Sequence, residues 1–297
     1  MFTKFVWAVL FAFILPAWPL PAQTTWSINN TTNIGGLNTL NHGSPQVIAT
    51  PYGNAVLFNG INQGIVVPTN PIAGATNFTV EMIFRPDAST VSSSTQPRIF
   101  HIQSPNPPDH RLTLEARVGS ATWYADTFLR TSATANLTLA DSSKTHPVAV
   151  WHQLAVTYDG AQFRQYVNGT LELSGALMVT PLTNGLCSIG MRANTNNFFQ
   201  GAVLALRFTP RVLSTNEFMC IPKTLLSALR LSNGQAQLDF TLTAGLPIGF
   251  TLQQADAPGG TWSVNSNAVL ATNSEGVSYR FTAPAGNSNR FFRLRWP

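Results

Sequence analysis

One stretch, residues 151–170, constrains the fold more than any other part of this sequence. It reads WHQLAVTYDGAQFRQYVNGT, and the bulky residues at 154, 156 and 158 alternate with small or polar ones. This period of two is typical of a strand with one buried face. Asp159-Gly160 interrupts the first strand, and Asn168-Gly169 ends the second. Because a type I′ turn needs positive φ at both central residues, Asn-Gly predicts a two-residue hairpin here.

Similar short strands are predicted along most of the chain. Only 10% of the residues are charged, whereas turn-forming residues are abundant, which is typical of an all-β protein. The expected strands before residue 222 are 55–58, 64–67, 78–84, 98–103, 111–118, 122–129, the run within 151–173, 187–190 and 202–208. Residues 214–218 are the one helical exception, because Ser214 followed by Glu217 forms a capping box.

Several of these segments carry a family resemblance, in addition to the first stretch. They are AVLFNG at 55–60, FTVEMIFRP at 78–86, SIG at 188–190, FQGAV at 199–203 and VLSTNEF at 212–218. In this order they resemble the motifs of laminin-G-like, concanavalin A-like domains. The resemblance implies an antiparallel jelly-roll β-sandwich over residues 23–222. It implies no single activity, since this sandwich occurs in lectins, adhesion modules, glycosidases and lyases.

A second unit is expected over residues 226–297. The composition shifts near residue 222, and period-two runs follow at 236–242, 249–254, 261–264, 277–282 and 290–295. Several short strands within this length predict a small Ig- or fibronectin-like sandwich. The segments GFTLQQADAPGGTWS and NRFFRLRW are similar to the C-terminal modules of exported bacterial proteins, which implies a spacer or sorting role.

The first 22 residues have the pattern of a signal peptide. Lys4 precedes an apolar run at 5–15, and Leu20-Pro21-Ala22 offers a cleavage site. The run is shorter than the roughly 20 apolar residues of a membrane span. We therefore expect a secreted, periplasmic or cell-surface protein with no span after cleavage. A retained membrane anchor is the alternative.

The charge of the chain argues against one class of partner. Its 17 basic and 12 acidic side chains give a net charge of +5, or +4 without Lys4. No run of Lys or Arg is present, so we expect no nucleic acid partner. The small excess is compatible with simple solubility or with an anionic polysaccharide.

The two cysteines, Cys187 and Cys220, predict one disulfide in an exported protein. Such a bridge would fasten the end of the jelly roll to its sheet. The alternative is a pair of buried free thiols.

The sequence lacks the acidic motif of one glycosidase type. The E-x-D-x-x-E motif of the laminarinase-like members of this superfamily is absent, because no two acidic residues lie within five positions of each other. Glu115 and Asp126 could still meet across a hairpin, so other hydrolases stay open. His110, His146 and His152 lack zinc-ligand spacing. We expect a protein without catalytic activity, with a polysaccharide hydrolase or lyase as the alternative.

A structural Ca²⁺ is the one metal that the resemblance implies. Asn59 stands where the family often has an aspartate, which removes one charged ligand. We therefore expect no cofactor, with Ca²⁺ as the alternative.

The candidate binding face lies on the strands predicted at 98–103, 111–118 and 122–129. Leu112, Leu114, Ala116 and Val118 should point to one side of their strand and the polar residues between them to the other. His101 and Gln103 come from the strand before. The site residues that we select are Arg111, Glu115, Arg117, Trp123, Tyr124 and Asp126, with Trp123 as a stacking platform for a sugar ring or, alternatively, a core residue.

This face has three interpretations. It is a solvated surface with cross-strand ion pairs, a saccharide-binding surface or a catalytic site. From the second, we expect non-catalytic binding of an extracellular polysaccharide or cell-surface glycan. A structural or adhesion module without a glycan ligand is the further alternative.

Overall fold

The computed structural model describes residues 22–88, 96–104, 110–219, 221, 224–242, 250–274, 278–286 and 290–295. Within these ranges the regular elements are antiparallel strands and a single turn of 3₁₀ helix, η2 (Thr215–Glu217). No helix among them is long and apolar enough to cross a membrane. The signal peptide expected at residues 1–22 lies almost wholly outside the described residues, apart from Ala22.

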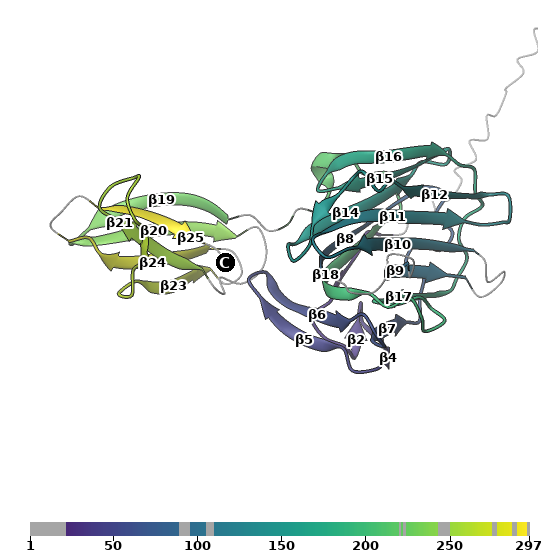
Figure 1. Cartoon of the computed structure of the whole chain (residues 1–297), viewed down its shortest axis with the longest axis horizontal. Coiled ribbons are helices and arrows are strands. Elements are labelled where there is room, and N and C mark those ends of the chain that lie inside the picture. The colour runs from purple at the N-terminus through teal and green to yellow at the C-terminus, as the bar shows by residue number, and fades with distance from the viewer. Residues whose placement is uncertain are drawn as a thin grey trace, which may run out of the picture.

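Two eight-stranded sheets form the larger part of the protein (Figure 1). The first has the order β16 (Thr170–Ala176), β15 (Gln162–Val167), β14 (His152–Tyr158), β8 (Phe78–Pro86), β18 (Gln200–Thr209), β6 (Gly53–Asn59) and β5 (Gln46–Thr50), with β1 (Thr24–Ser27) paired to β18. The second has the order β12 (Asn136–Ala140), β11 (Thr122–Arg130), β10 (Arg111–Val118), β9 (Arg98–Gln103), β17 (Leu186–Ile189), β7 (Gly64–Val67) and β4 (Leu40–His42), with β13 (His146–Pro147) paired to β11. A short ribbon joins β2 (Asn33–Ile34) to β3 (Leu37–Asn38). The expected antiparallel jelly-roll sandwich is thereby confirmed.

The hairpin between β15 and β16 confirms the strongest turn prediction. Asn168 has a φ of 51° and Gly169 a φ of 78°, the two positive values that a type I′ turn requires. The Asn168 side chain also accepts a hydrogen bond from the Gln153 amide at 3.0 Å, which ties the turn to β14. Local sequence therefore fixes the register of this hairpin.

The core lies between the two sheets and is rich in aromatic rings. Phe84 of the first sheet meets Trp123 of the second edge to face at 5.0 Å between centroids. Phe208 of β18 likewise lies 5.5 Å from Phe100 of β9. All four side chains are buried, and each such ring contributes about 1.5–3 kcal/mol by leaving water.

The 3₁₀ turn and the segment after it close over the outer side of the first sheet. The Glu217 carboxylate accepts a hydrogen bond from the Ser214 amide at 2.9 Å, so the expected capping box is confirmed. Glu81 of β8 is fully buried beneath this segment. Its carboxylate accepts hydrogen bonds from Arg207 Nε and from the Met219 amide, both at 2.6 Å.

The strands after residue 223 form two further sheets. One has the order β19 (Thr224–Ser232), β20 (Gln235–Leu242), β24 (Ser278–Pro284) and β23 (Val269–Ser274), and the other β22 (Ser263–Val264), β21 (Thr251–Ala255) and β25 (Phe291–Arg295). Phe240 is at the centre of their own apolar cluster, with the Tyr279 and Phe281 rings stacked at 5.6 and 5.8 Å. Whether residues 226–297 form an independent Ig- or fibronectin-like domain stays a prediction.

The structure does not support the expected disulfide. Cys187 is a free thiol whose side chain is fully buried in the core, and Cys220 lies outside the described residues. The ladder partners of Cys187 show which way its side chain points. Cys187 pairs with Val67 on one side and Ile102 on the other, so it shares their inward face.

We predict that reduction leaves the stability unchanged. Burial raises the pKa of the Cys187 thiol well above its usual value, so the reactive thiolate is suppressed in the folded chain. In a Cys220→Ser variant, a thiol reagent such as dithiobis-nitrobenzoate should react only after unfolding. The variant and the wild type should show the same Tm with and without dithiothreitol. A wild-type Tm that falls on reduction would show instead that a disulfide exists.

Candidate functional site

The ladder between β10 and β11 decides which side chains reach the outer face of the second sheet. It pairs Glu115 with Asp126, Arg117 with Tyr124 and Arg111 with Arg130. Because partners in a ladder share a face, these side chains lie together on the side away from the core. We call the outward side chains of β9, β10 and β11 the polar face, which comprises Arg98, His101, Gln103, Arg111, Thr113, Glu115, Arg117, Tyr124, Asp126, Phe128 and Arg130.

Two carboxylates on the polar face are held by arginines. The Glu115 carboxylate forms an ion pair with the Arg98 guanidinium. Asp126 Oδ2 accepts from Arg117 Nε at 2.7 Å and from its Nη2 at 2.6 Å. Both carboxylates are almost fully buried, with side-chain exposures of 4% and 5%. Since they stand directly opposite each other on neighbouring strands, the two arginines offset their mutual repulsion.

Burial changes the protonation of Glu115. It raises the pKa of this carboxyl to about 8, against the opposite influence of the Arg98 charge. Glu115 and Asp126 are neighbouring carboxyl groups on β10 and β11, so the meeting across a hairpin that the sequence left open does occur.

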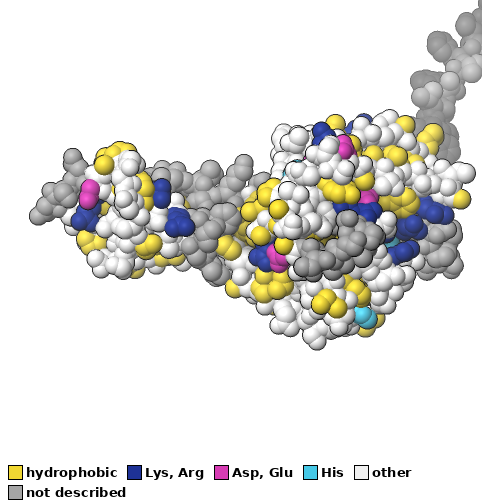
Figure 2. Space-filling model, viewed as in Figure 1, with side chains coloured by type: hydrophobic (Ala, Val, Ile, Leu, Met, Phe, Trp, Pro, Cys, Tyr) yellow, Lys and Arg dark blue, Asp and Glu magenta, His cyan; other side chains and the backbone are white. Residues whose placement is uncertain are grey.

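A hollow of about 190 Å³ opens over this cluster. Gln96, Arg98, Arg111, Glu115, Arg117, Asp126, Phe128 and Thr138 line it. The Arg111 guanidinium lies over the Phe128 ring, 4.9 Å from its centroid, which is a cation–π contact. In Figure 2, Lys and Arg side chains gather at one end of the sheet that carries β10 and β11.

His101 is the most deeply buried ionisable residue of the polar face, and it anchors a loop beside that face. Its Nδ1 accepts a hydrogen bond from the Ala193 amide at 3.1 Å, and its side chain is fully buried. Burial, together with the charges of Arg98, Arg192 and Arg111, lowers the pKa of His101 to about 3. The ring is therefore neutral near pH 7. A buried imidazole of such low pKa is a poor general base, which weakens the lyase interpretation.

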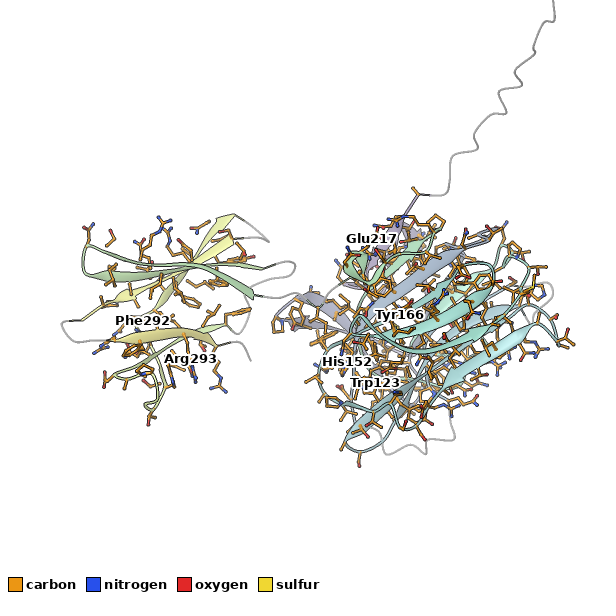
Figure 3. The ribbon with its side chains drawn as sticks, turned by 90° about the horizontal axis from the view of Figure 1, so that it is seen from above. Trp123, His152, Tyr166, Glu217, Phe292 and Arg293 are labelled. Carbon is orange, nitrogen blue, oxygen red and sulfur yellow. The ribbon has the colours of Figure 1, made fainter. Side chains whose placement is uncertain are left out.

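The structure corrects one member of the expected site. Trp123 is fully buried in the core and cannot stack on a sugar ring in solution. It pairs with Val118, an inward residue, whereas its neighbour Tyr124 pairs with Arg117 on the polar face. Trp123 instead packs against the His146 and His152 rings at 5.1 Å each, and Figure 3 shows Trp123 and His152 side by side. The other five expected residues do lie on the polar face.

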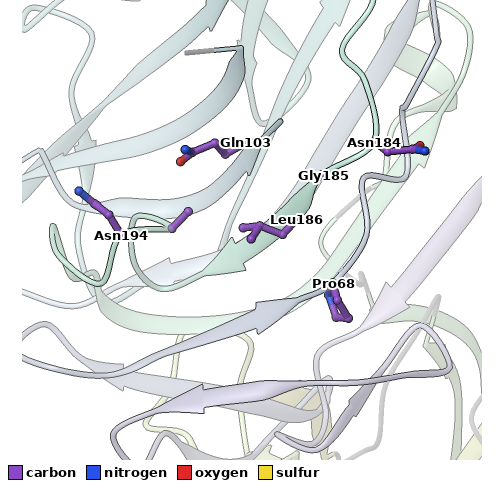
Figure 4. A pocket seen from close by; sticks show the side chains of 7 residues that line it. Pro68, Gln103, Asn184, Gly185, Leu186 and Asn194 are labelled. Carbon is purple, nitrogen blue, oxygen red and sulfur yellow. The ribbon is translucent and has the colours of Figure 1, made fainter. Parts of the chain in front are cut away.

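A second and larger pocket was not predicted from the sequence. It has a volume of about 470 Å³ and is lined by Pro68, Gln103, Asn184, Gly185, Leu186, Ala193 and Asn194 (Figure 4). These residues come from four separate segments, so no spacing in the sequence marks them. The one sequence signal for this pocket was Gln103. It lies two residues after His101 in the same strand, so its side chain points to the same outer face.

The residue considered for Ca²⁺ has a different role in the structure. Asn59 Oδ1 accepts hydrogen bonds from the Ile61 and Asn62 amides at 2.9 and 3.1 Å, which closes the turn after β6. In the described part of the chain, no three His, Cys, Asp or Glu side chains group as metal ligands. Ca²⁺ binding stays the untested alternative.

Comparison with known proteins gives a family match over the middle of the chain. Residues 59–218 match the family model Laminin_G_3, described as the concanavalin A-like lectin/glucanases superfamily. Among curated proteins, none matches the chain.

Three solved structures illustrate the similarity in fold. Domain 4 of an extracellular GH43 arabinanase from Geobacillus stearothermophilus, in complex with arabinotriose, is 18% identical, with 65% of this chain and 94% of that one covered and a TM-score of 0.47. The binding domain of botulinum neurotoxin DC, in complex with SialylT, is 10% identical, with 91% and 87% covered and a TM-score of 0.48. The carbohydrate-binding module CBM66 from Bacillus subtilis is 10% identical, with 56% and 91% covered and a TM-score of 0.32.

We predict that Trp123 stabilises the fold. Trp123→Ala should lower the free energy of unfolding by about 3–5 kcal/mol, because it leaves a cavity against Phe84. Tyr124→Ala, on the opposite face of the same strand, should cost clearly less. Urea denaturation followed by circular dichroism measures both values. Equal losses would mean that Trp123 does not pack in the core.

We also predict that His101 makes the fold sensitive to acid. Its folded pKa of about 3 lies below the ordinary value of 6.5, so the unfolded state binds the proton more readily. The stability that depends on neutral His101 is complete above pH 6.5 and is lost as the pH falls towards 3. The slope reaches at most about 1.4 kcal/mol per pH unit.

Denaturation of a His101→Asn variant at several pH values tests this prediction. Between pH 6 and pH 4, the free energy of unfolding of the variant should fall less steeply than that of the wild type. His152, whose pKa burial also lowers, contributes to the slope that remains. Parallel curves for the two proteins would contradict the role of His101.

Proposed function

The chain belongs to the concanavalin A-like lectin/glucanase superfamily, and from this premise we propose that it is an exported, non-catalytic protein that binds an extracellular polysaccharide or cell-surface glycan through the polar face. The observation that carries the proposal is the polar face itself, where two hollows of about 470 and 190 Å³ lie on one sheet. Their linings combine guanidinium, carboxylate and amide groups with the ring of Phe128.

These groups suit a ligand that is rich in hydroxyl groups. Carboxylates accept hydrogen bonds, guanidinium groups donate them, and amides do both, whereas a sugar hydroxyl can take either role. The ion pairs of Arg98 with Glu115 and of Arg117 with Asp126 already hold four of these groups in place. A ligand would therefore meet a preorganised surface and lose less side-chain entropy on binding.

A polysaccharide hydrolase is the second candidate, and one observation favours it. Glu115 and Asp126 are direct cross-strand partners, and burial raises the pKa of Glu115 to about 8. Glycosidases use two neighbouring carboxyl groups, one protonated and one ionised. We prefer the binding function because each carboxyl group is almost fully buried and is engaged by an arginine.

Export and the C-terminal unit complete the proposal. Residues 1–22 have the pattern of a signal peptide, which supports a secreted, periplasmic or cell-surface location. Residues 226–297, with their own apolar cluster around Phe240, would then serve as a spacer or sorting module.

The test is a binding screen of residues 23–297 against neutral and acidic polysaccharides, with and without Ca²⁺. We expect binding without release of reducing ends or unsaturated products. Arg117→Ala should weaken it by about tenfold, because it removes a charged donor and frees the Asp126 carboxylate. Arg164→Ala is the matched control, since Arg164 pairs with Asp159 at 2.7 Å on the other sheet.

Each outcome of the screen selects one function. Product that disappears in Glu115→Gln would establish the hydrolase. Absence of binding across the panel would favour the structural or adhesion role and reduce the polar face to ordinary surface. Equal losses for the Arg117 and Arg164 variants would place the binding surface elsewhere.

A further inference from the structure

The larger pocket has the size and lining of a site for one sugar ring. Its volume of about 470 Å³ is within the range of small-molecule sites. Gln103 lies half-buried within it, while Asn184 and Asn194 are exposed at its rim, and none of the described residues that line it is charged. Most of this lining is apolar, and its amide groups both donate and accept hydrogen bonds, so it suits a ring that carries hydroxyl groups better than a free ion.

The frame of this pocket is tightly built. A Cβ atom at Gly185 would lie 2.2 Å from the Gln103 carbonyl oxygen, so the backbone can pass this close to β9 only as glycine. On the other side, the hydrogen bond from Ala193 to His101 holds the loop that carries Asn194. Both rims are therefore fixed by contacts with β9.

The two hollows adjoin at one strand pair. Gln103 of the larger pocket and Arg111 of the smaller one are partners in the ladder between β9 and β10. The Cβ atoms of such partners are about 4.5–5.5 Å apart. A ligand that extends from Gln103 across this pair thus enters the smaller hollow, which Arg111 lines.

Arginines outnumber carboxyl groups near this junction in the part of the chain that the structure describes. Among the described residues, two carboxylates, Glu115 and Asp126, stand among five arginines, which are Arg98, Arg111, Arg117, Arg130 and Arg192. Besides burial, the charges of three of these arginines lower the pKa of His101. The electrostatic potential at His101 therefore has a positive contribution from these arginines. The face of the Arg111 guanidinium packs on the Phe128 ring. The N–H donors of a guanidinium lie in its plane, where they can form hydrogen bonds to a carboxylate or sulfate.

We propose that the two hollows form one site for a glycan whose sugar ring carries an anionic group. The ring occupies the pocket of Gln103, Asn184 and Asn194, and its carboxylate or sulfate reaches Arg111. The inference rests on the proposed function and names the class of glycan, an acidic one. Uronic acids and sulfated sugars share this chemistry.

Calorimetric titration with three probes tests the proposal. They are an oligogalacturonate, its carboxyl-reduced neutral counterpart, and a sulfated carrageenan oligosaccharide. We expect one of the two anionic probes to bind more tightly than the neutral one, and to bind more weakly as NaCl is raised. Arg111→Gln should weaken that anionic probe by about tenfold or more and leave the neutral one unchanged. Asn194→Ala should weaken both.

The control is Arg230→Gln, which removes the same charge from an exposed position on β19 and should change nothing. Thermal unfolding of each variant shows that the fold is retained. Equal binding of the neutral and anionic probes, or an Arg111 variant that matches the wild type, would overturn the acidic ligand and leave glycan binding intact. If only neutral glycans bind, the same conclusion follows. If no glycan of either kind binds, the proposed function fails as well.

Discussion

The alternation of side chains along β10 and β11 is the constraint from which both the core and the polar face follow. Each strand gives every second residue to the interior and the others to the outer face. A shift of one residue in the β10–β11 hairpin would bury Arg117 and expose Trp123. Burying an arginine and exposing a large aromatic ring are both unfavourable, so the register of the two strands is fixed. The same pairing that completes the core therefore assembles the site.

The polar face owes its rigidity to buried charge rather than to apolar packing. Burying an ion pair stabilises a fold little, because desolvation offsets most of the attraction. What such pairs add is a defined position for each group, and here Arg98, Glu115, Arg117 and Asp126 hold one another across three strands. Neutral His101 on the same face keeps a loop in place. The site is thus defined before any ligand arrives.

Local signals predicted the strands well, because turns and alternation are properties of neighbouring residues. The ranges 64–67, 98–103 and 111–118 agree with β7, β9 and β10 residue by residue. Trp123 was misplaced because its side depends on the loop at 119–122, which aligns it with Val118. The larger pocket escaped prediction since tertiary packing alone brings Pro68, Gln103 and Asn194 together. The disulfide was inferred from a count of cysteines, which says nothing about where Cys187 points.

The paired charges also limit how such a protein can diverge. Loss of one member of the Arg98–Glu115 or Arg117–Asp126 pair leaves the other member buried without its partner, which lowers the stability of the fold. Over generations, these positions would have to change two at a time and so would change slowly. Asn184 and Asn194, exposed at the rim of the neighbouring pocket, are under no such constraint. Proteins that descend from this chain would therefore change ligand preference through the rim positions, while the two buried pairs stay the same.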